Sequence, residues 1–571
     1  MGVRNHLAAS GLAAALLALP AIDHAATITG DVSIDGQPVR GAMVTVFTAD
    51  KTVSQTVFSD ATGHYRLETE FSGKLSLRGR APLAADAVAP LGLVGPATKL
   101  EQRLSLRRLV TPQEISDSLP ASAHYARIKF PSLTKARQFQ ADCTPCHQIG
   151  DRLTRQNLGL EGWKKVLPSM LAYADYSTQF HLEEYAAALN RAFDGTPTPA
   201  RQNTVVDEQV LTAKIVEWKL PESQFPHDSE FDPATGKIYS VDLFVDKIWI
   251  TDPKTNKTTI VPLPDLGVPI GGSFAGADGA PSWIPKVRHG NHSLRLSPYD
   301  GLFYLTGSVG GEIGTFDPKT QAFKVHKIGG NAAWPHTLVF DAKGIIWFTV
   351  LISNQMGRFD PKTGKMTLID LPKNPGDSAD DPADARIPSP YGIDVNPVDG
   401  SVWYTKVWSD KVGRVDATTL EVKEWTPPLK TPRRGAFDNQ GNFWIPGLGD
   451  GNIARLDTKT MKYELFKVPT LAPEEVESPY FLAVNKKTQE IWISANQSDR
   501  MFRFAPKSNT WTAYPMPTRG LYQRDIVFND AGWACSPSSP TPPEDGADGS
   551  TDSLLCVQPE GNKATSPSVA H

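Results

Sequence analysis

The sequence predicts a multidomain, mainly β protein: a β-sandwich, then a small all-α segment, then a seven-bladed β-propeller. Residues 27–110 alternate apolar and polar side chains, whereas residues 133–194 place apolar side chains at the helical period. From residue 213 onward, a unit of short strands led by Trp or Tyr recurs about every 40–50 residues, as in propellers. We therefore divide the chain into a signal peptide (1–25), a sandwich (27–110), an all-α segment (130–197), a propeller (208–560) and a disordered tail (561–571).

The composition and the N-terminal residues limit the partners and the cellular location that we expect. The 571 residues carry a formal net charge of −4 and contain no basic run, which argues against nucleic acid as a partner. Arg4 and the apolar stretch Leu7–Leu19 have the pattern of an export signal that is too short to span a membrane. We expect a periplasmic or otherwise exported protein with no transmembrane segment after signal cleavage; an uncleaved N-terminal anchor is the alternative.

The expected sandwich shows period-2 alternation, punctuated by turn signals such as Asp35-Gly36. Its stretch ITGDVSIDGQPVRGAMVTVF, followed by SDATGHYRLE, resembles the carboxypeptidase regulatory-like domain. In that family the domain is an accessory, so the resemblance implies no catalytic residue here. The expected core positions are Ile28, Val32, Ile34, Ala42, Val44, Val46, Tyr65, Leu67, Leu75 and Leu77.

After a Pro-containing linker at 111–132, helices are expected at about 133–146, 160–175 and 181–194. The first helix runs into Cys143-Thr144-Pro145-Cys146-His147, the attachment pattern of c-type heme. Two thiols one turn apart can each add to a heme vinyl group, which places His147 as the proximal iron ligand. The segment resembles small class I-like cytochrome c domains, which implies one covalent heme c. The alternatives are a Cys143–Cys146 disulfide or a zinc site.

The sixth iron ligand has two candidates. Met170 lies on the expected inner face of the second helix, and thioether ligation would raise the heme potential. His181, at the start of the third helix, is the rival and would give a bis-His heme of lower potential. Ordinary core packing is the competing interpretation of Met170.

Seven propeller units are predicted, each with one residue that follows the turn before its innermost strand. Six outer strands are visible after residue 257, so strand 213–220 is expected to supply the seventh and to close the ring. The last unit also contains Cys535 and Cys556 on neighbouring antiparallel strands, which predicts a disulfide rather than two free thiols. The seven turn residues are His227, His292, His336, Tyr391, Arg433, Tyr480 and Arg524.

The repeat resembles virginiamycin B lyase (streptogramin lyase), most closely where Trp347–Thr349 is followed by GRFDP and where Trp403 is followed by GRVD. The resemblance implies a seven-bladed propeller over about 213–560 and leaves room for a divalent cation in its axial funnel. In the family, a magnesium ion and a His/Glu set open a macrolactone ester. This sequence departs from the Glu-x-His turn of the family, because Tyr480 and Arg524 occupy the matching turns.

If the seven turn residues face the funnel, they form a polar mouth that could bind an anionic or polyhydroxylated substrate, with a histidine as general base. The alternative is that they only cap turns between blades. The favoured interpretation is an exported hemoprotein that transfers electrons to or from a redox partner protein or small-molecule substrate, as an oxidoreductase. A streptogramin-lyase-like carbon–oxygen lyase with an appended cytochrome, and a non-catalytic docking scaffold, are the alternatives.

Overall fold

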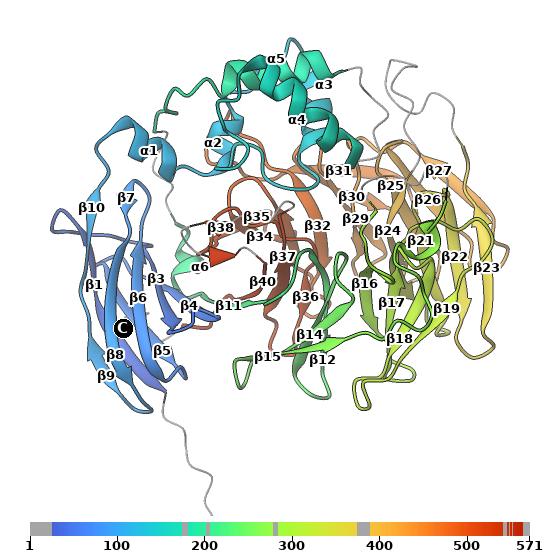
Figure 1. Cartoon of the computed structure of the whole chain (residues 1–571), viewed down its shortest axis with the longest axis horizontal. Coiled ribbons are helices and arrows are strands. Elements are labelled where there is room, and N and C mark those ends of the chain that lie inside the picture. Colours follow the sequence, from blue (N-terminus) through green and yellow to red (C-terminus); the bar gives the residue numbers. More distant parts are fainter. Residues whose placement is uncertain are drawn as a thin grey trace, which may run out of the picture.

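The computed structural model describes residues 25–173, 181–200, 206–277, 284–373, 389–540, 545–546, 549–550 and 552–562, with the side chains of 171–173 and 545–550 left aside. The expected signal peptide and tail therefore lie almost entirely outside the described residues. The chain is mainly β, with a propeller-like series of four-stranded sheets (Figure 1). Within the described residues, no helix combines the length and apolarity needed to cross a membrane.

The N-terminal region folds as two packed sheets, as its alternation predicts. All of its expected core positions are buried in a single cluster. One sheet has the order β2 (Gln37–Pro38), β1 (Ala26–Ile34), β10 (Leu104–Arg108) and β7 (Ala84–Ala85), with β5 (His64–Thr69) and β9 (Lys99–Glu101) also paired to β1. The other contains β4 (Val53–Phe58), β3 (Met43–Thr48), β6 (Gly73–Arg80) and β8 (Ala87–Val94).

Helices follow the sandwich and lie along one end of the propeller-like sheets (Figure 1). The three expected helices are present as α3, α4 and α5. The expected linker 111–132 is wrong in part, because it contains α1 and α2; Thr111 and Glu114 form a capping box that starts α1. The helices are α1 (Pro112–Ser118), α2 (Ala121–Tyr125), α3 (Leu133–Cys143), α4 (Gly159–Tyr173), α5 (Leu182–Ala192) and α6 (Glu208–Leu211).

Six four-stranded antiparallel sheets follow in chain order, each with its first strand innermost. They are β12 (Pro226–Asp232), β13 (Lys237–Asp242), β14 (Lys247–Asp252) and β15 (Lys257–Pro262); β16 (Asn291–Leu296), β17 (Phe303–Gly307), β18 (Glu312–Phe316) and β19 (Phe323–Lys327); β20 (Pro335–Phe340), β21 (Ile346–Val350), β22 (Gln355–Asp360) and β23 (Lys365–Asp370); β24 (Pro390–Val395), β25 (Val402–Lys406), β26 (Lys411–Val415) and β27 (Val422–Trp425); β28 (Ala436–Phe437), β29 (Asn442–Gly447), β30 (Asn452–Asp457) and β31 (Lys462–Lys467); β32 (Pro479–Val484), β33 (Ile491–Ala495), β34 (Arg500–Ala505) and β35 (Thr510–Pro515).

A further group of four strands has the order β36 (Val527–Phe528), β37 (Ala534–Ser538), β40 (Ser553–Gln558) and β11 (Lys214–Lys219). The expected closing strand therefore pairs with the last strand of the chain, as predicted. Cys535 and Cys556 face each other across β37 and β40 and form the predicted disulfide. A short pair, β38 (Asp545–Gly546) and β39 (Gly549–Ser550), lies in the connecting segment. The last group also returns to the first sheet, where Ser539 Oγ donates to the Pro226 carbonyl oxygen at 2.8 Å.

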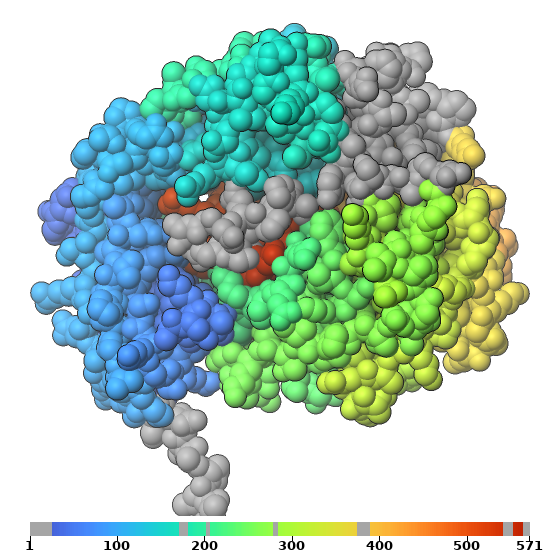
Figure 2. Space-filling model, in the orientation of Figure 1, coloured from blue at the N-terminus to red at the C-terminus, as the bar shows by residue number. Residues whose placement is uncertain are grey.

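The sandwich is joined to this last group by a continuous ladder. One edge of β11 pairs with β40 and the other with β4, so one eight-stranded sheet runs from β36 to β8. Trp218 and Cys556 share a buried cluster with sandwich residues such as Val44. Because β11 is covered on both edges, it exposes no unpaired backbone groups. The sandwich (blue), the helices (teal) and the sheets (green to red) consequently form one continuous body (Figure 2).

Candidate functional site: an axial ring beneath the cysteine motif

The seven predicted turn residues meet at the inner ends of the sheets and are all buried. Five of them lie at β-bulges near the start of the innermost strands, where the register shifts. A bulge re-aims the local side chains, which explains how these residues turn toward the axis. The remaining two, Arg433 and Arg524, precede the short strands β28 and β36. We call the set of seven the axial ring: His227, His292, His336, Tyr391, Arg433, Tyr480 and Arg524.

The first part of the axial ring consists of three imidazoles. The ring centroid of His292 lies 3.6 Å from that of His227 and 3.8 Å from that of His336. Nδ1 of His227 hydrogen-bonds to Asp228 and Nδ1 of His336 to the Thr337 hydroxyl, both at 2.8 Å. Burial, and then the neighbouring imidazoles and guanidinium groups, lowers the pKa of each of the three histidines well below its usual value. All three are therefore neutral at physiological pH.

The second part consists of alternating phenols and guanidinium groups. Arg433 lies between Tyr391 and Tyr480, 4.6 and 4.8 Å from their ring centroids. The two phenol oxygens are 2.6 Å apart. Burial raises the pKa of Tyr391, whereas for Tyr480 the positive charges of Arg524 and Arg433 outweigh burial and lower it. Either phenol can be the donor of this hydrogen bond.

A layer of ion pairs closes the axis below the ring. Arg434 Nη1 binds both oxygens of Asp228 at 2.8 Å, which links β12 to the opposite side of the molecule. Arg295 Nη1 lies 3.2 Å from Asp525 and 3.5 Å from Asp228. Two carboxylates and two guanidinium groups thus compensate one another in a buried position, where an unpaired charge would cost several kcal/mol.

The cysteine motif lies directly on the phenol and guanidinium part of the ring. Arg524 Nη2 donates to the Cys146 carbonyl oxygen at 2.9 Å, and Nη1 to the Pro145 carbonyl oxygen at 3.4 Å. The Tyr522 hydroxyl donates to the Thr144 carbonyl oxygen. Three consecutive carbonyl groups of the motif are therefore held by two side chains of the segment that leads into β36.

Two glutamines on either side of the motif extend this contact. Gln140 Nε2 donates to the carbonyl oxygens of Leu448 and Glu477, both at 2.8 Å. Gln148 Nε2 donates to Asp499 at 2.7 Å and to the Leu521 carbonyl oxygen at 2.8 Å. Both glutamines are buried. The helical segment is thus fixed to the loops of the fifth, sixth and last sheets.

The predicted heme-binding residues lie at the end of α3 and on α4. Cys143 and Cys146 are both half-buried, and His147 is buried with its Nδ1 2.9 Å from the Gln148 carbonyl oxygen. Met170 is 41% exposed, so it does not face the core formed by Trp163 and Leu167. His181 stacks on Tyr185 with a centroid distance of 5.4 Å. Cys143, Cys146 and His147 thus lie together at the end of α3. The two candidates for the sixth ligand lie on α4 (Met170) and at the start of α5 (His181).

Several residues of the site were not predicted. Tyr522, Gln140 and Gln148 carry no repeat or motif signal, since their partners are backbone groups far away in sequence. Asp228 and Arg434 could have been noticed, because each directly follows a ring residue. Their pairing across the axis depends on the number and tilt of the sheets, which the repeat does not specify.

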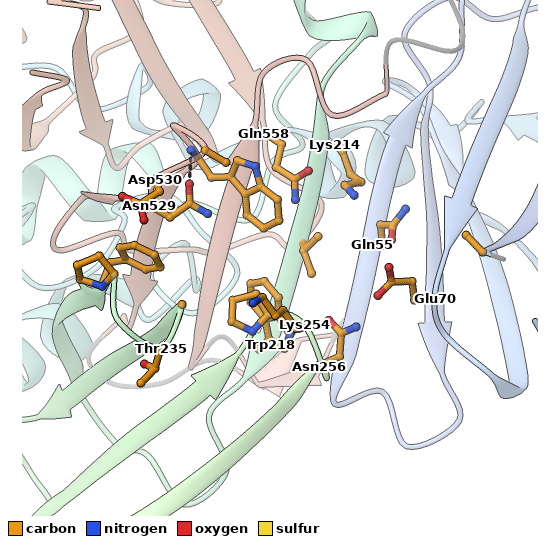
Figure 3. A pocket seen from close by; sticks show the side chains of 18 of the residues that line it. Gln55, Glu70, Lys214, Trp218, Thr235, Lys254, Asn256, Asn529, Asp530 and Gln558 are labelled. Carbon is orange, nitrogen blue, oxygen red and sulfur yellow. Dashed lines mark hydrogen bonds between the residues drawn. The ribbon is translucent and has the colours of Figure 1, made fainter. Parts of the chain in front are cut away.

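A cavity of about 780 Å³ lies elsewhere, between the sandwich, β11, β40 and the turns of the first and last sheets (Figure 3). None of the axial ring residues lines it. Its polar lining includes Gln55, Lys214 and Gln558 from three adjacent strands, and Trp533 supplies an aromatic side chain. Gln558 Nε2 is buried without a hydrogen-bond partner among the described residues. The lining is therefore mixed, since Trp218, Phe231 and Phe71 also contribute apolar side chains.

Comparisons with known proteins give limited similarity. No family model matches the chain, and no curated protein matches its sequence. A solved streptogramin B lyase is 18% identical, with a TM-score of 0.48 over 62% of this chain and 99% of that one. Two structures of virginiamycin B lyase from Staphylococcus aureus, one of a catalytically inactive variant with quinupristin, are each 18% identical over 61% of this chain and 99% of theirs, with TM-scores of 0.46 and 0.47. The likeness concerns the propeller-like fold, which the chain's own sheets show independently.

Proposed function

We propose that this chain is an exported c-type hemoprotein. In it, a seven-bladed propeller, closed by β11, carries a cytochrome c-like segment over its axial mouth. The heme would be attached to Cys143 and Cys146, with His147 as proximal ligand, and would serve electron transfer in an oxidoreductase. One observation carries the proposal: Arg524 and Tyr522 hold the backbone of the Cys-x-x-Cys-His motif against the axial ring. An attached heme would then be next to the residues that can bind a substrate or partner.

The residues of the motif suit a c-type heme. The two cysteines are partly accessible, as covalent attachment requires. The hydrogen bond from His147 Nδ1 to the Gln148 carbonyl oxygen makes Nε2 the nitrogen that carries the lone pair, which is the usual arrangement of an iron-ligating imidazole. The Trp163 indole N–H is buried without an acceptor among the described residues and could serve a propionate group. Met170 or His181 would supply the sixth ligand.

When bound, a c-type heme supplies reversible one-electron chemistry at its iron. The protein residues determine what approaches it. Arg433 offers a guanidinium group to an anionic or polyhydroxylated molecule, Arg524 adds its positive charge while its donors hold the cysteine motif, and the neutral imidazoles can accept a proton. Their burial keeps water away, which strengthens these interactions. A redox partner protein, or a small-molecule substrate in the axial funnel, would exchange electrons with the heme.

A carbon–oxygen lyase with an appended cytochrome is the weaker proposal. Magnesium needs oxygen ligands. The axial ring offers imidazoles, phenols and guanidinium groups instead, and the nearby carboxylates Asp228 and Asp525 are already bound by arginines. The residues therefore do not suit a magnesium-dependent elimination, and we derive no step of that kind. A docking scaffold without catalysis would use the same surfaces but would need no substrate.

Expression with the native leader in a host that attaches c-type heme tests the proposal. The expected result is a covalent heme in the periplasmic fraction, measured as one pyridine hemochrome per chain. A Cys143→Ser/Cys146→Ser variant should lose it completely. The matched control, Cys535→Ser/Cys556→Ser, alters the other pair of cysteines and should keep the heme. A wild-type protein without covalent heme would overturn the proposal.

A further inference from the structure

The three imidazoles of the axial ring are not explained by heme binding or by contacts with the cysteine motif. They come from β12, β16 and β20, the innermost strands of the first three sheets. His292 lies between His227 and His336, whose ring centroids are 6.4 Å apart. Ligand atoms of His227, Asp228 and His292 lie within 4.8 Å of one another. Two buried imidazoles and a carboxylate at these distances, with the third imidazole packed against His292, are donor groups that transition metals accept.

The hydrogen bonds of the flanking histidines determine which nitrogen faces the cluster. Nδ1 of His227 donates to the Asp228 carboxylate, so the lone pair of this ring is on Nε2, whereas Nδ1 of His336 lies 2.8 Å from the Thr337 hydroxyl, which can donate or accept. A carboxylate or hydroxyl partner on the remote nitrogen is the common support of a metal-ligating histidine. Asp228 is therefore a positioning residue, because its charge is already compensated by Arg434.

The central histidine supplies a second observation. His292 is 3% exposed, and its Nδ1 has no hydrogen-bond partner among the described residues. A buried nitrogen without a hydrogen-bond partner destabilises the folded state. A bound metal ion would remove this cost, since either nitrogen of the ring can serve as a ligand.

The charges around the cluster limit what can bind. Arg433, Arg434 and Arg524 disfavour an added cation, and the carboxylates of Asp228, Asp525 and Glu230 offset part of the local positive charge. Neutral imidazoles bind zinc, copper, nickel or iron strongly enough to overcome such repulsion, whereas magnesium and calcium prefer oxygen ligands. The same arginines would favour an anion, such as hydroxide or a carboxylate, in a remaining coordination position.

We propose that His227, His292 and His336 bind one transition-metal ion in the axial funnel and leave a position for an anionic ligand. The site is separate from the heme-binding residues and does not depend on the proposed heme. It also differs from the Glu-x-His turn of the lyases, because its ligands come from the first three sheets rather than from the turns that hold Tyr480 and Arg524. A metal here would give the chain a second centre next to the cysteine motif.

Metal titration of the full-length protein tests the proposal. The apo protein should bind one equivalent of Zn²⁺ or Cu²⁺ and no Mg²⁺. His227→Ala, His292→Ala and His336→Ala should each weaken binding at least roughly tenfold, whereas Asp228→Asn should weaken it about 10–100-fold through loss of positioning. The matched control is His64→Ala, at an exposed histidine of the sandwich, and it should bind as the wild type does.

Two further measurements make the outcome decisive. The heme-free Cys143→Ser/Cys146→Ser variant should keep the metal, which separates this proposal from the hemoprotein proposal. If the histidine variants do not fold, the Cu²⁺ EPR spectrum of the wild type replaces them, and coupling to at least two nitrogen nuclei is expected. Absence of stoichiometric binding, equal binding by folded histidine variants, or a copper spectrum without nitrogen coupling would overturn the proposal.

Discussion

The two parts of the axial ring occupy equivalent positions in the sheets but have opposite environments. Arg524 donates hydrogen bonds to the Tyr480 hydroxyl and to the backbone of the cysteine motif. His227 and His336 pack on either side of His292, and Nδ1 of His292 has no hydrogen-bond partner among the described residues. A nearly symmetric set of sheets can therefore support a docking surface on one side of its axis and leave ligand-binding atoms on the other.

The difference follows from side-chain chemistry. A guanidinium group has five donors and no acceptor, so backbone carbonyl groups satisfy it well. A neutral imidazole has one donor and one acceptor, and once its donor is used, the remaining lone pair suits a metal or a proton. Arg524 consequently explains where the cysteine motif lies, whereas the histidines do not.

Arg524→Ala should remove the main contact between the axial ring and the cysteine motif, and it should have the largest effect on stability. Arg524 is buried and donates to Cys146, Pro145 and Ser539, so its loss leaves several carbonyl groups unsatisfied. We expect the free energy of unfolding to fall by about 3–5 kcal/mol. Urea denaturation measures the loss, and limited proteolysis between 195 and 210 should become faster. Arg103→Ala, at an exposed arginine, should change stability by less than about 0.5 kcal/mol.

Removal of the Cys535–Cys556 disulfide should weaken the sheet that carries Arg524. The two cysteines are 21 residues apart, and closing a loop of this length is worth about 3 kcal/mol through the entropy of the unfolded chain. Denaturation of Cys535→Ser/Cys556→Ser should show this loss, while metal binding by the histidines should persist at low temperature. An unchanged unfolding midpoint would mean that the ladder of β37 and β40 alone fixes this sheet.

The docked side should also respond to pH through Glu477. Burial raises the pKa of Glu477 to about 7, against the opposing effect of Arg500 and Ser498. Because the folded pKa exceeds the unfolded one, this stabilising contribution is complete below about pH 4.5 and is lost as the pH rises toward 7. Glu477→Gln should therefore flatten the stability profile between these values by roughly 2–3 kcal/mol. Glu464→Gln, at an exposed site, should leave the profile unchanged. A wild-type profile that rises over this interval would contradict the prediction.

Tyr391→Phe tests whether the histidines and the phenols act independently, and it should have the smallest effect on stability. It removes only the hydrogen bond to Tyr480, so stability should fall by about 1 kcal/mol. Metal binding should be unchanged, since the phenyl ring still packs against His336. A large loss of Zn²⁺ affinity in this variant would show that the two parts act as one site.

Much of the architecture could be predicted from local patterns. Period-2 alternation identified the buried positions of the sandwich, such as Val44 and Leu77, because burial on one face requires it. Alignment of the repeats identified the axial ring, since equivalent positions in repeated units occupy equivalent places. Counting outer strands predicted that β11 joins the last strands of the chain, and strand neighbourhood predicted the disulfide.

The sequence by itself determined which residues converge on the axis and where the cysteine motif stands in the chain. Only the tertiary structure decided that this motif lies on Arg524 and Tyr522, that Arg434 reaches Asp228, and that β4 extends the last sheet through β11. The physical reason is that repeats and motifs are local, whereas these contacts join groups up to several hundred residues apart and depend on how the sheets are arranged around the axis.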